Sequence, residues 1–423
     1  MNGSKSVGLG QQIVDESGAG QESASSSSSL RQALGLAGAV VGLVVAVTAC
    51  ACGPLMVGLS ALVSDGLPDG VAIQQALAMT ILGGGLGLAV TVEGWRVWQG
   101  RPSPPFHPRR TWVLWVVLLP LLAAGLLVSF LAPAHLLPPI NTLTMLLLPT
   151  LVLGAVGQVM GGSGGTWRDV VGGLAGGAFL GTGLAMVVEV GMVVFVAVVA
   201  LVLGLMPGGV GGLESLGQRL SDPALLYDPQ ALLDFLTPTV VLVVLAFVSV
   251  ATPLVEETTK TLGAGLAGTW LRPSPAHAFL LGVASGAGFA LAENLLNGAV
   301  LSVLWGPGIL SRLAATLMHC ATGGLMGWGW GELWARQRPW RLALAFAGAV
   351  GIHGVWNGLA VGAAVSGLVA AGMADDPVRG KIAALVALVL VTAMLLMAAA
   401  TLVGVLWAGR VLSRAAVSQP HSS

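Results

Sequence analysis

Polar side chains interrupt the apolar sequence between residues 256 and 357, and their types are those that activate water. A charged side chain near the centre of a bilayer costs about 2.5–3.5 kcal/mol on insertion scales, so several of them together indicate a function. Carboxylates, imidazoles and an ammonium are the groups that a hydrolase uses to move protons or to hold a metal ion. They form four groups along the chain: Glu256, Glu257 and Lys260; Phe289, Glu293 and Asn294; His319; and His353 with Asn357.

The spacing inside two of these groups places residues on shared helix faces. Glu256 and Lys260 are four residues apart, so we expect them to share a face and the ammonium to keep a carboxylate ionised. Glu257 lies about 100° further round a helix and would point into a neighbouring cavity. His353 and Asn357 are one turn apart, so the amide would fix the ring tautomer or share an anion-binding role.

Small residues accompany the other two groups. Residues of this size let neighbouring helices approach closely. Phe289 lies one turn before Glu293 and is expected to pack beside its carboxylate. The small residues are Gly282, Ser285, Gly286 and Gly288 before Glu293, and Gly323, Gly327 and Gly331 at four-residue spacing after His319.

Each group taken alone also has a structural interpretation. The glutamate doublet could be the interfacial end of a helix, Glu293 could serve only helix association, and a lone intramembrane histidine is often a packing residue. The four groups together are more specific than any one of them.

The composition of the whole chain defines the elements that must position these residues. The chain is 55% hydrophobic and only 9% charged, with a mean hydropathy of +0.89 over 423 residues. Such a composition is typical of a polytopic membrane protein. The net charge is zero, so no nucleic-acid partner is expected.

Apolar runs of about 20 residues predict an all-α polytopic integral membrane bundle of about ten transmembrane helices. The sixth to ninth of these helices carry the polar groups and are expected to form the catalytic bundle. The predicted spans are 33–63, 71–93, 112–133, 140–160, 171–206, 239–268, 278–299, 309–334, 342–370 and 382–409.

Charges in the loops predict the orientation. Arginines gather in alternate loops and after the last span, whereas the opposite loops are mostly acidic or uncharged and the last of them is mixed. Both termini are therefore expected to be cytoplasmic. The predicted divisions are a disordered cytoplasmic tail at 1–30, a membrane region of unknown role at 31–206, an outer loop at 207–238, the bundle with the four polar groups at 239–370, and a last loop, helix and tail at 371–423.

The order EExxK, FxxxEN, His and HxxxN on four successive helices resembles the PrsW family of intramembrane proteases. That family belongs to a wider group with the CAAX prenyl endopeptidases and the bacteriocin-immunity-type membrane proteases. The resemblance covers residues 240–368, including the segments VEETTK, GFALAEN and HGVWN. It implies that Glu256, Glu257, Glu293, His319 and His353 form the active site, with Lys260, Asn294, Arg312 and Asn357 as supporting residues.

Two mechanisms of peptide-bond hydrolysis remain open at this stage. In the first, His319, His353 and Glu293 hold a divalent metal such as Zn²⁺ and Glu257 is the general base. In the second no metal takes part, and Glu256 or Glu257 deprotonates water while a histidine and Asn357 stabilise the oxyanion. The sequence contains no HExxH motif, so the familiar soluble metalloprotease arrangement is absent.

The expected partners are a membrane-protein substrate and the lipid bilayer, in the plasma membrane of a bacterium. An alternative is a proton-coupled transporter or channel, because intramembrane carboxylates and histidines also build proton relays. Glu93 and Glu189, outside the segment of resemblance, would serve such a path. A third alternative is a scaffold that binds partners through glycine-rich faces such as Gly172–Gly173 and Gly176–Gly177.

Overall fold

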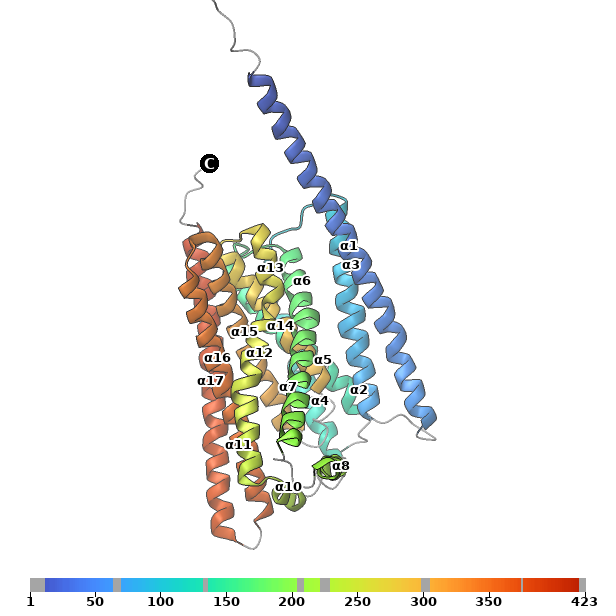
Figure 1. The fold of residues 1–423 in the computed structure, drawn as a ribbon, viewed down its shortest axis with the longest axis vertical. Helices are drawn as coiled ribbons and strands as arrows, with labels where there is room; N and C mark the ends of the chain where they lie inside the picture. Colours follow the sequence, from blue (N-terminus) through green and yellow to red (C-terminus); the bar gives the residue numbers. More distant parts are fainter. Residues whose placement is uncertain are drawn as a thin grey trace, which may run out of the picture.

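The computed structural model describes residues 12–63, 70–131, 136–203, 209–220, 229–297, 305–373 and 376–417. Within these ranges the regular structure is helical, and the β-type pairing is confined to one isolated bridge between Pro105 and Thr166. The prediction of an all-α membrane bundle is therefore confirmed (Figure 1).

The helices follow one another as a series of long rods joined by short connections. In chain order they are α1 (Gln12–Val63), α2 (Gly70–Met79), η1 (Thr80–Leu86), α3 (Gly87–Trp98), α4 (Trp112–Leu131), α5 (Leu137–Met160), α6 (Trp167–Ala175), η3 (Gly176–Gly181), α7 (Thr182–Val202), α8 (Gly209–Leu220), α10 (Pro229–Phe235), α11 (Pro238–Ala246), η4 (Phe247–Ala251), α12 (Thr252–Lys260), α13 (Leu262–Leu271), α14 (Pro275–Asn297), α15 (Trp305–Arg336), α16 (Pro339–Gly372) and α17 (Pro377–Val417).

Nine continuous helical stretches in the described part of the chain are long and apolar enough to cross a membrane. Nine of the ten predicted spans correspond to them. The remaining one, 309–334, corresponds to α15, which has 32 residues but is not among the nine. The polar residues of α15, including Arg312, His319 and Glu332, reduce its apolarity, and most of these face the protein interior.

The predicted disordered tail differs from the structure. Residues 12–30 continue α1 as helix, and residues 1–11 lie outside the described residues. Extending an existing helix adds one hydrogen bond for each residue that is fixed, whereas starting one is costly. The apolar stretch of α1 therefore provides the nucleus from which the polar segment continues.

The two ends of the described chain lie at the same end of the bundle. Figure 1 shows the start of α1 and the end of α17 at one end, with α8 and α10 of the predicted outer loop at the other. Residues 221–228 of that loop lie outside the described residues. Both ends of the described chain thus lie on the same side of the bundle, in agreement with the arrangement that the loop charges predicted.

The centre of the bundle is α14, which packs against α15, α6, η3 and α5. Its contact with α15 is close because glycines face each other across it. A Cβ atom at Gly327 would lie 2.8 Å from Cα of Gly282, and one at Gly323 would lie 3.0 Å from Cα of Gly286. The predicted glycine face after His319 therefore serves to bring α15 onto α14.

The glycine-rich face of α6 and η3 also packs inside the molecule. A Cβ at Gly173 would meet Ala284 of α14, and one at Gly177 would meet the carbonyl oxygen of Ser285. Gly173 and Gly177 thus pack against α14 of the same chain, whereas a Cβ at Gly172 would meet nothing within 4 Å.

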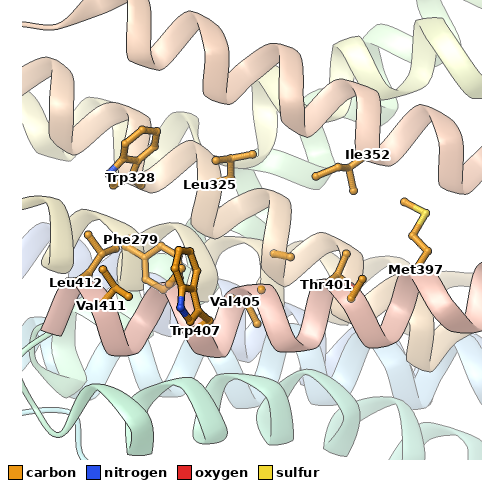
Figure 2. Close-up of a pocket in the computed structure, with 14 residues that line it drawn as sticks. Phe279, Leu325, Trp328, Ile352, Met397, Thr401, Val405, Trp407, Val411 and Leu412 are labelled. Atoms are coloured by element: carbon orange, nitrogen blue, oxygen red, sulfur yellow. The ribbon is translucent and has the colours of Figure 1, made fainter. Parts of the chain in front are cut away.

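An apolar cavity of about 530 Å³ lies among α14, α15, α16 and α17. Figure 2 shows Phe279, Leu325, Ile352 and Thr401 around it. None of the residues that line this cavity is ionisable, so it offers no group for proton transfer or metal binding. The chemistry of the molecule must therefore be sought elsewhere in the bundle.

Candidate catalytic site

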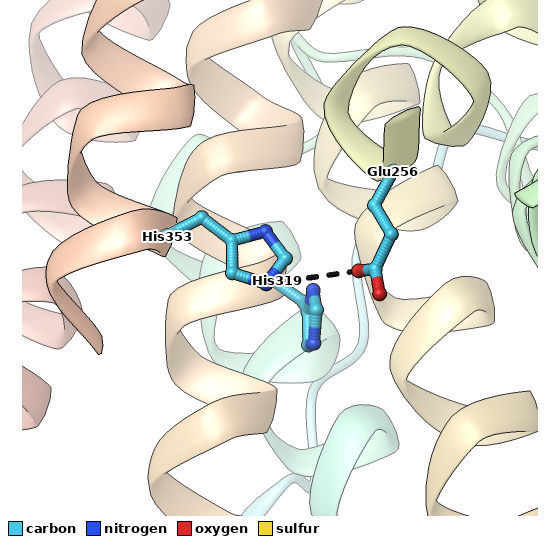
Figure 3. A group of neighbouring side chains, drawn as sticks. All are labelled: Glu256, His319 and His353. Atoms are coloured by element: carbon cyan, nitrogen blue, oxygen red, sulfur yellow. Dashed lines mark ion pairs between the residues drawn. The ribbon is translucent and has the colours of Figure 1, made fainter. Parts of the chain in front are cut away.

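Helices α12, α14, α15 and α16 bring the four polar groups of the sequence together inside the bundle. Glu257 and Lys260 are fully buried, and His319 and His353 are each 2% exposed. Figure 3 shows Glu256, His319 and His353 converging from three different helices. One ligand atom from each of these three residues lies within 4.8 Å of the others, a separation that a single metal ion could bridge.

The two ring nitrogens of His353 face different glutamates, and one of them is hydrogen-bonded. Its Nδ1 lies 2.8 Å from Oε1 of Glu257 in a buried hydrogen bond. Its Nε2 lies 3.7 Å from Oε2 of Glu256. The bond to Glu257 fixes the orientation of the ring and leaves Nε2 for a ligand.

His319 has the same arrangement with its two nitrogens exchanged. Its Nε2 lies 2.8 Å from Oε2 of Glu293, and its Nδ1 is buried without a hydrogen-bond partner in the described structure. The rings of His319 and His353 meet edge to face, with centroids 5.1 Å apart. Each histidine is thus backed by one carboxylate and keeps one nitrogen available.

Glu257 is held by donors from three helices. Its Oε1 accepts hydrogen bonds from Lys260 at 2.5 Å and Thr322 at 3.1 Å, in addition to its contact with His353. Lys260 also lies over the ring of Phe289, 4.9 Å from its centroid. The sequence analysis paired Lys260 with Glu256. The structure pairs it with Glu257 instead, because residues three apart are also neighbours on a helix.

Glu293 is fixed on the other side of the cluster. Arg312 donates a hydrogen bond of 2.7 Å to Oε1 of Glu293, so the predicted supporting arginine acts on this carboxylate. Asn294 donates to the hydroxyl of Thr316 at 2.9 Å and thereby joins α14 to α15. Phe289 packs against the ring of His319, with centroids 5.3 Å apart, as well as against Lys260.

Asn357 supports a different element from the one expected. Its Nδ2 donates a hydrogen bond of 2.8 Å to the carbonyl oxygen of Val248, in the π-helical segment η4. Short π-helical segments leave backbone groups that need outside partners, and they are frequent at functional sites. Asn357 therefore anchors η4, and through it the start of α12, to the helix that carries His353.

Two hydroxyl residues of the site were not recognised from the sequence. Thr322 donates to Glu257, and Ser285 donates a hydrogen bond of 2.5 Å to the carbonyl oxygen of Lys260. This bond satisfies the backbone where α12 ends and α13 begins. Small residues, including serine and threonine, are common where membrane helices pack, so no sequence signal distinguishes these two.

The described residues that could hold a metal differ from the predicted set. The sequence analysis combined His319 and His353 with Glu293, whereas the group in the structure contains Glu256. Glu293 is occupied by Arg312 and backs His319 from the other side. A doublet of glutamates on one helix does not reveal from sequence which member faces the histidines.

The same residues pass a test of whether a cation fits. Oε2 of Glu256 and Nδ1 of His319 are buried and have no hydrogen-bond partner in the described structure. Buried polar atoms normally have hydrogen-bond partners, and those that have none indicate a site for a water or an ion, or a catalytic role. Two imidazole nitrogens and a carboxylate oxygen also match the donors that Zn²⁺ takes in catalytic sites.

Comparison with known proteins agrees with this geometry. A sequence model described as PrsW family intramembrane metalloprotease matches residues 165–398, more than half of the chain. The chain belongs to the PrsW family of intramembrane metalloproteases. No curated protein and no solved structure matches it. The protein is therefore a hydrolase, and the transporter interpretation is set aside.

The family match is wider than the resemblance seen from the motifs. It begins at residue 165 rather than 240, so α6, η3 and α7 belong to the matched region of the PrsW protein. Glu189 of α7, which the sequence analysis placed outside the family segment, consequently lies inside it.

Proposed function

We propose that this protein cleaves a peptide bond of a membrane-protein substrate with a water molecule activated at Glu256, His319 and His353. The observation that carries the proposal is the convergence of these three side chains, from three helices, with ligand atoms within 4.8 Å of one another. Their burial at the centre of a bundle of membrane-length helices favours a substrate that is itself in the membrane.

The three residues would hold a divalent ion such as Zn²⁺. When bound, the ion would polarise the scissile carbonyl and make water easier to deprotonate. Glu257 and Glu293 would act one layer further out, each holding one histidine in the orientation that presents its remaining nitrogen. Arg312, Lys260 and Thr322 in turn fix these two carboxylates.

The charges of the cluster also favour a cation. Glu256, Glu257 and Glu293 carry three negative charges when ionised, whereas Lys260 and Arg312 carry two positive ones, so neutral histidines leave an excess of one negative charge. An unbalanced charge in a buried site is costly unless it is paired or coordinates a metal. The metal version of the mechanism is thus the one that the geometry supports best.

This assignment changes the role proposed for Glu257. The sequence analysis made it the general base, but its Oε1 receives Lys260, Thr322 and His353 together. We propose that Glu257 positions His353 and holds Lys260, and that the proton-accepting role belongs to another carboxylate.

Purified protein in detergent provides the test. We expect about one Zn²⁺ per chain by elemental analysis, and cleavage of dye–quencher-labelled single-span peptides reconstituted with the protein in lipid vesicles. Chelation should stop cleavage and Zn²⁺ should restore it. His353→Ala should lose both the metal and the cleavage, and a His353→Ala variant that cleaves at the wild-type rate would refute the proposed site.

We also propose that the protein lies in a bacterial plasma membrane with both termini in the cytoplasm. In a variant without Cys50, Cys52 and Cys320, a cysteine at exposed Ser215 of α8 should react with an impermeant maleimide in intact cells. A cysteine at exposed Gln337, after α15, should react only after lysis. The opposite labelling pattern would contradict this orientation.

A further inference from the structure

One ionisable side chain close to the site has no role in the network described above. Glu189 is the only charged residue of α7, a helix whose surface is otherwise turned mostly to lipid. Its neighbours Val187 and Val190 are 71% and 61% exposed, whereas Glu189 is partly buried and its Oε1 is enclosed by protein. Lipid cannot solvate an ionised carboxylate, so its position on the inner face of this helix requires an explanation.

The inner face of α7 lies against the helices that carry the catalytic carboxylates. α7 packs on α12 and contacts α14. The charge of Glu189 interacts with that of Glu293 on α14 and with that of Glu256 on α12. Glu189 is thus the nearby carboxylate that α7 contributes to the edge of the cluster.

Glu189 differs from Glu257 and Glu293 because no donor among the described residues holds it. Glu256 also has no donor, but it is one of the three proposed metal ligands. Glu257 is bound by Lys260 and Thr322, and Glu293 is bound by Arg312. Oε1 of Glu189 is buried with no hydrogen-bond partner in the described structure. A carboxylate fixed by cations is suited to orientation, whereas one without them is suited to taking and releasing a proton.

We propose that Glu189 is the proton-transfer residue of the hydrolysis, an inference that rests on the proposed function. Water adds its oxygen to the scissile carbonyl carbon and gives one proton to the Glu189 carboxylate, directly or through one further water. The carbon–nitrogen bond then breaks, and Glu189 returns that proton to the leaving nitrogen. The products are a carboxylic acid and an amine, and Glu189 is again ionised.

The charge count agrees with this role. With Glu189 included, four ionised carboxylates and neutral histidines beside Lys260 and Arg312 would give the cluster two excess negative charges, which a divalent ion would neutralise. Moving a proton from water to Glu189 inside the site leaves that total unchanged. A site sealed from water tolerates a charge-conserving step better than one that creates a net charge.

The test compares Glu189→Gln with Glu189→Asp and with the control Glu93→Gln. Glu93 is also a carboxylate of a membrane helix, but Arg96 and Arg168 pair with it and it lies outside the site. We expect Glu189→Gln to lower the cleavage rate of the vesicle-bound peptides by about 10²–10⁴-fold. Glu189→Asp should recover part of the rate, and Glu93→Gln should retain it.

Two measurements that do not depend on activity separate proton transfer from a structural role. Glu189→Gln should retain its Zn²⁺ stoichiometry, and its melting temperature in detergent should equal or exceed that of the wild type, because an unpaired buried carboxylate is removed. Loss of metal or a lower melting temperature would overturn the proposal, since Glu189 would then be holding the structure together.

The outcomes also distinguish this inference from the proposed function. A Glu189→Gln variant that cleaves at the wild-type rate, beside an inactive His353→Ala variant, would remove Glu189 from the mechanism and leave the metal site standing. An active His353→Ala variant would overturn both.

Discussion

Helix α15 contributes to two buried clusters of carboxylates, one around His319 near its middle and one around Glu332 near its C-terminal end. The two clusters are built differently. Glu332 is 1% exposed, and its two oxygens receive Arg336 at 2.7 Å and Arg341 at 2.8 Å, with Arg338 at 3.9 Å. Around His319, by contrast, Glu256, Glu257 and, on α7, Glu189 each keep an oxygen that has no hydrogen-bond partner in the described structure, whereas Glu293 is held by Arg312 and His319.

The difference separates a structural ion cluster from a reactive one. A buried acceptor without a partner costs about 1–3 kcal/mol, so a protein selected only for stability would satisfy it. The Glu332 cluster does so and joins α15 to α16. The cluster at His319 instead leaves acceptors and an imidazole nitrogen open, which is the state that a metal ion, a water or a substrate would complete.

The largest effect that would break this comparison is expected at Glu256. Glu256→Gln replaces a ligand oxygen with an amide and should reduce metal affinity by more than the 10–100-fold typical of residues that only support a ligand. Cleavage should fall below detection without loss of the fold. Zinc titration by calorimetry and the peptide assay check this, and wild-type affinity in Glu256→Gln would exclude Glu256 as a ligand.

The next effect sharpens the comparison by separating orientation from binding. Glu257→Gln should lower metal affinity by about 10–100-fold, because His353 loses the carboxylate that orients it. It should also destabilise the protein by about 3–5 kcal/mol, since the fully buried Lys260 loses its ion pair. The pairing of Lys260 with Glu256 that the sequence analysis made would not predict this loss of stability.

Stability should return when both charges are removed. The double variant Glu257→Gln, Lys260→Met should melt near the wild-type temperature, but its metal affinity should stay as low as that of Glu257→Gln. If the double variant is no more stable than Glu257→Gln alone, the ion pair is not the cause of the loss.

The helices and the membership of the site were predictable from sequence, whereas the pairing inside the site was not. Apolar runs predicted the spans, and the four motifs predicted which residues converge. The side chain that faces a histidine depends on helix rotation, and a rotation of one residue exchanges Glu256 with Glu257. For the same reason Asn357 was expected near His353, although it bonds to Val248.

The sequence analysis assigned Glu189 to the proton path of the transporter alternative and missed the two hydroxyls, for a related reason. A single acidic residue in an apolar helix has no partner in sequence that identifies which neighbour it faces, and α7 is separated from α12 by the outer segment. The packing of α7 on α12 is a tertiary fact that no local pattern encodes.

A smaller effect is expected where glycines set the distance between α14, which carries Glu293, and α15, which carries His319. A Cβ at Gly286 would overlap the carbonyl oxygen of His319, so Gly286→Ala should push α15 away from α14. We expect a loss of about 1–3 kcal/mol in stability and a partial loss of cleavage. Gly351→Ala in α16, where a Cβ meets nothing within 4 Å, is the matched control and should change neither.

The smallest effect on catalysis is expected at Glu332, near the C-terminal end of α15. Glu332→Gln removes a carboxylate that is as buried as Glu257. If burial alone made a carboxylate necessary for cleavage, the two variants would lose cleavage equally. The arginines that it leaves are 26–44% exposed on their side chains and can turn to water, so the loss of stability should be about 1–3 kcal/mol. Cleavage and zinc stoichiometry of Glu332→Gln should match the wild type at temperatures well below its melting point. A loss of metal in this variant would show that the two clusters are coupled along α15, and the distinction between a satisfied and an open carboxylate would then fail as a guide to the active site.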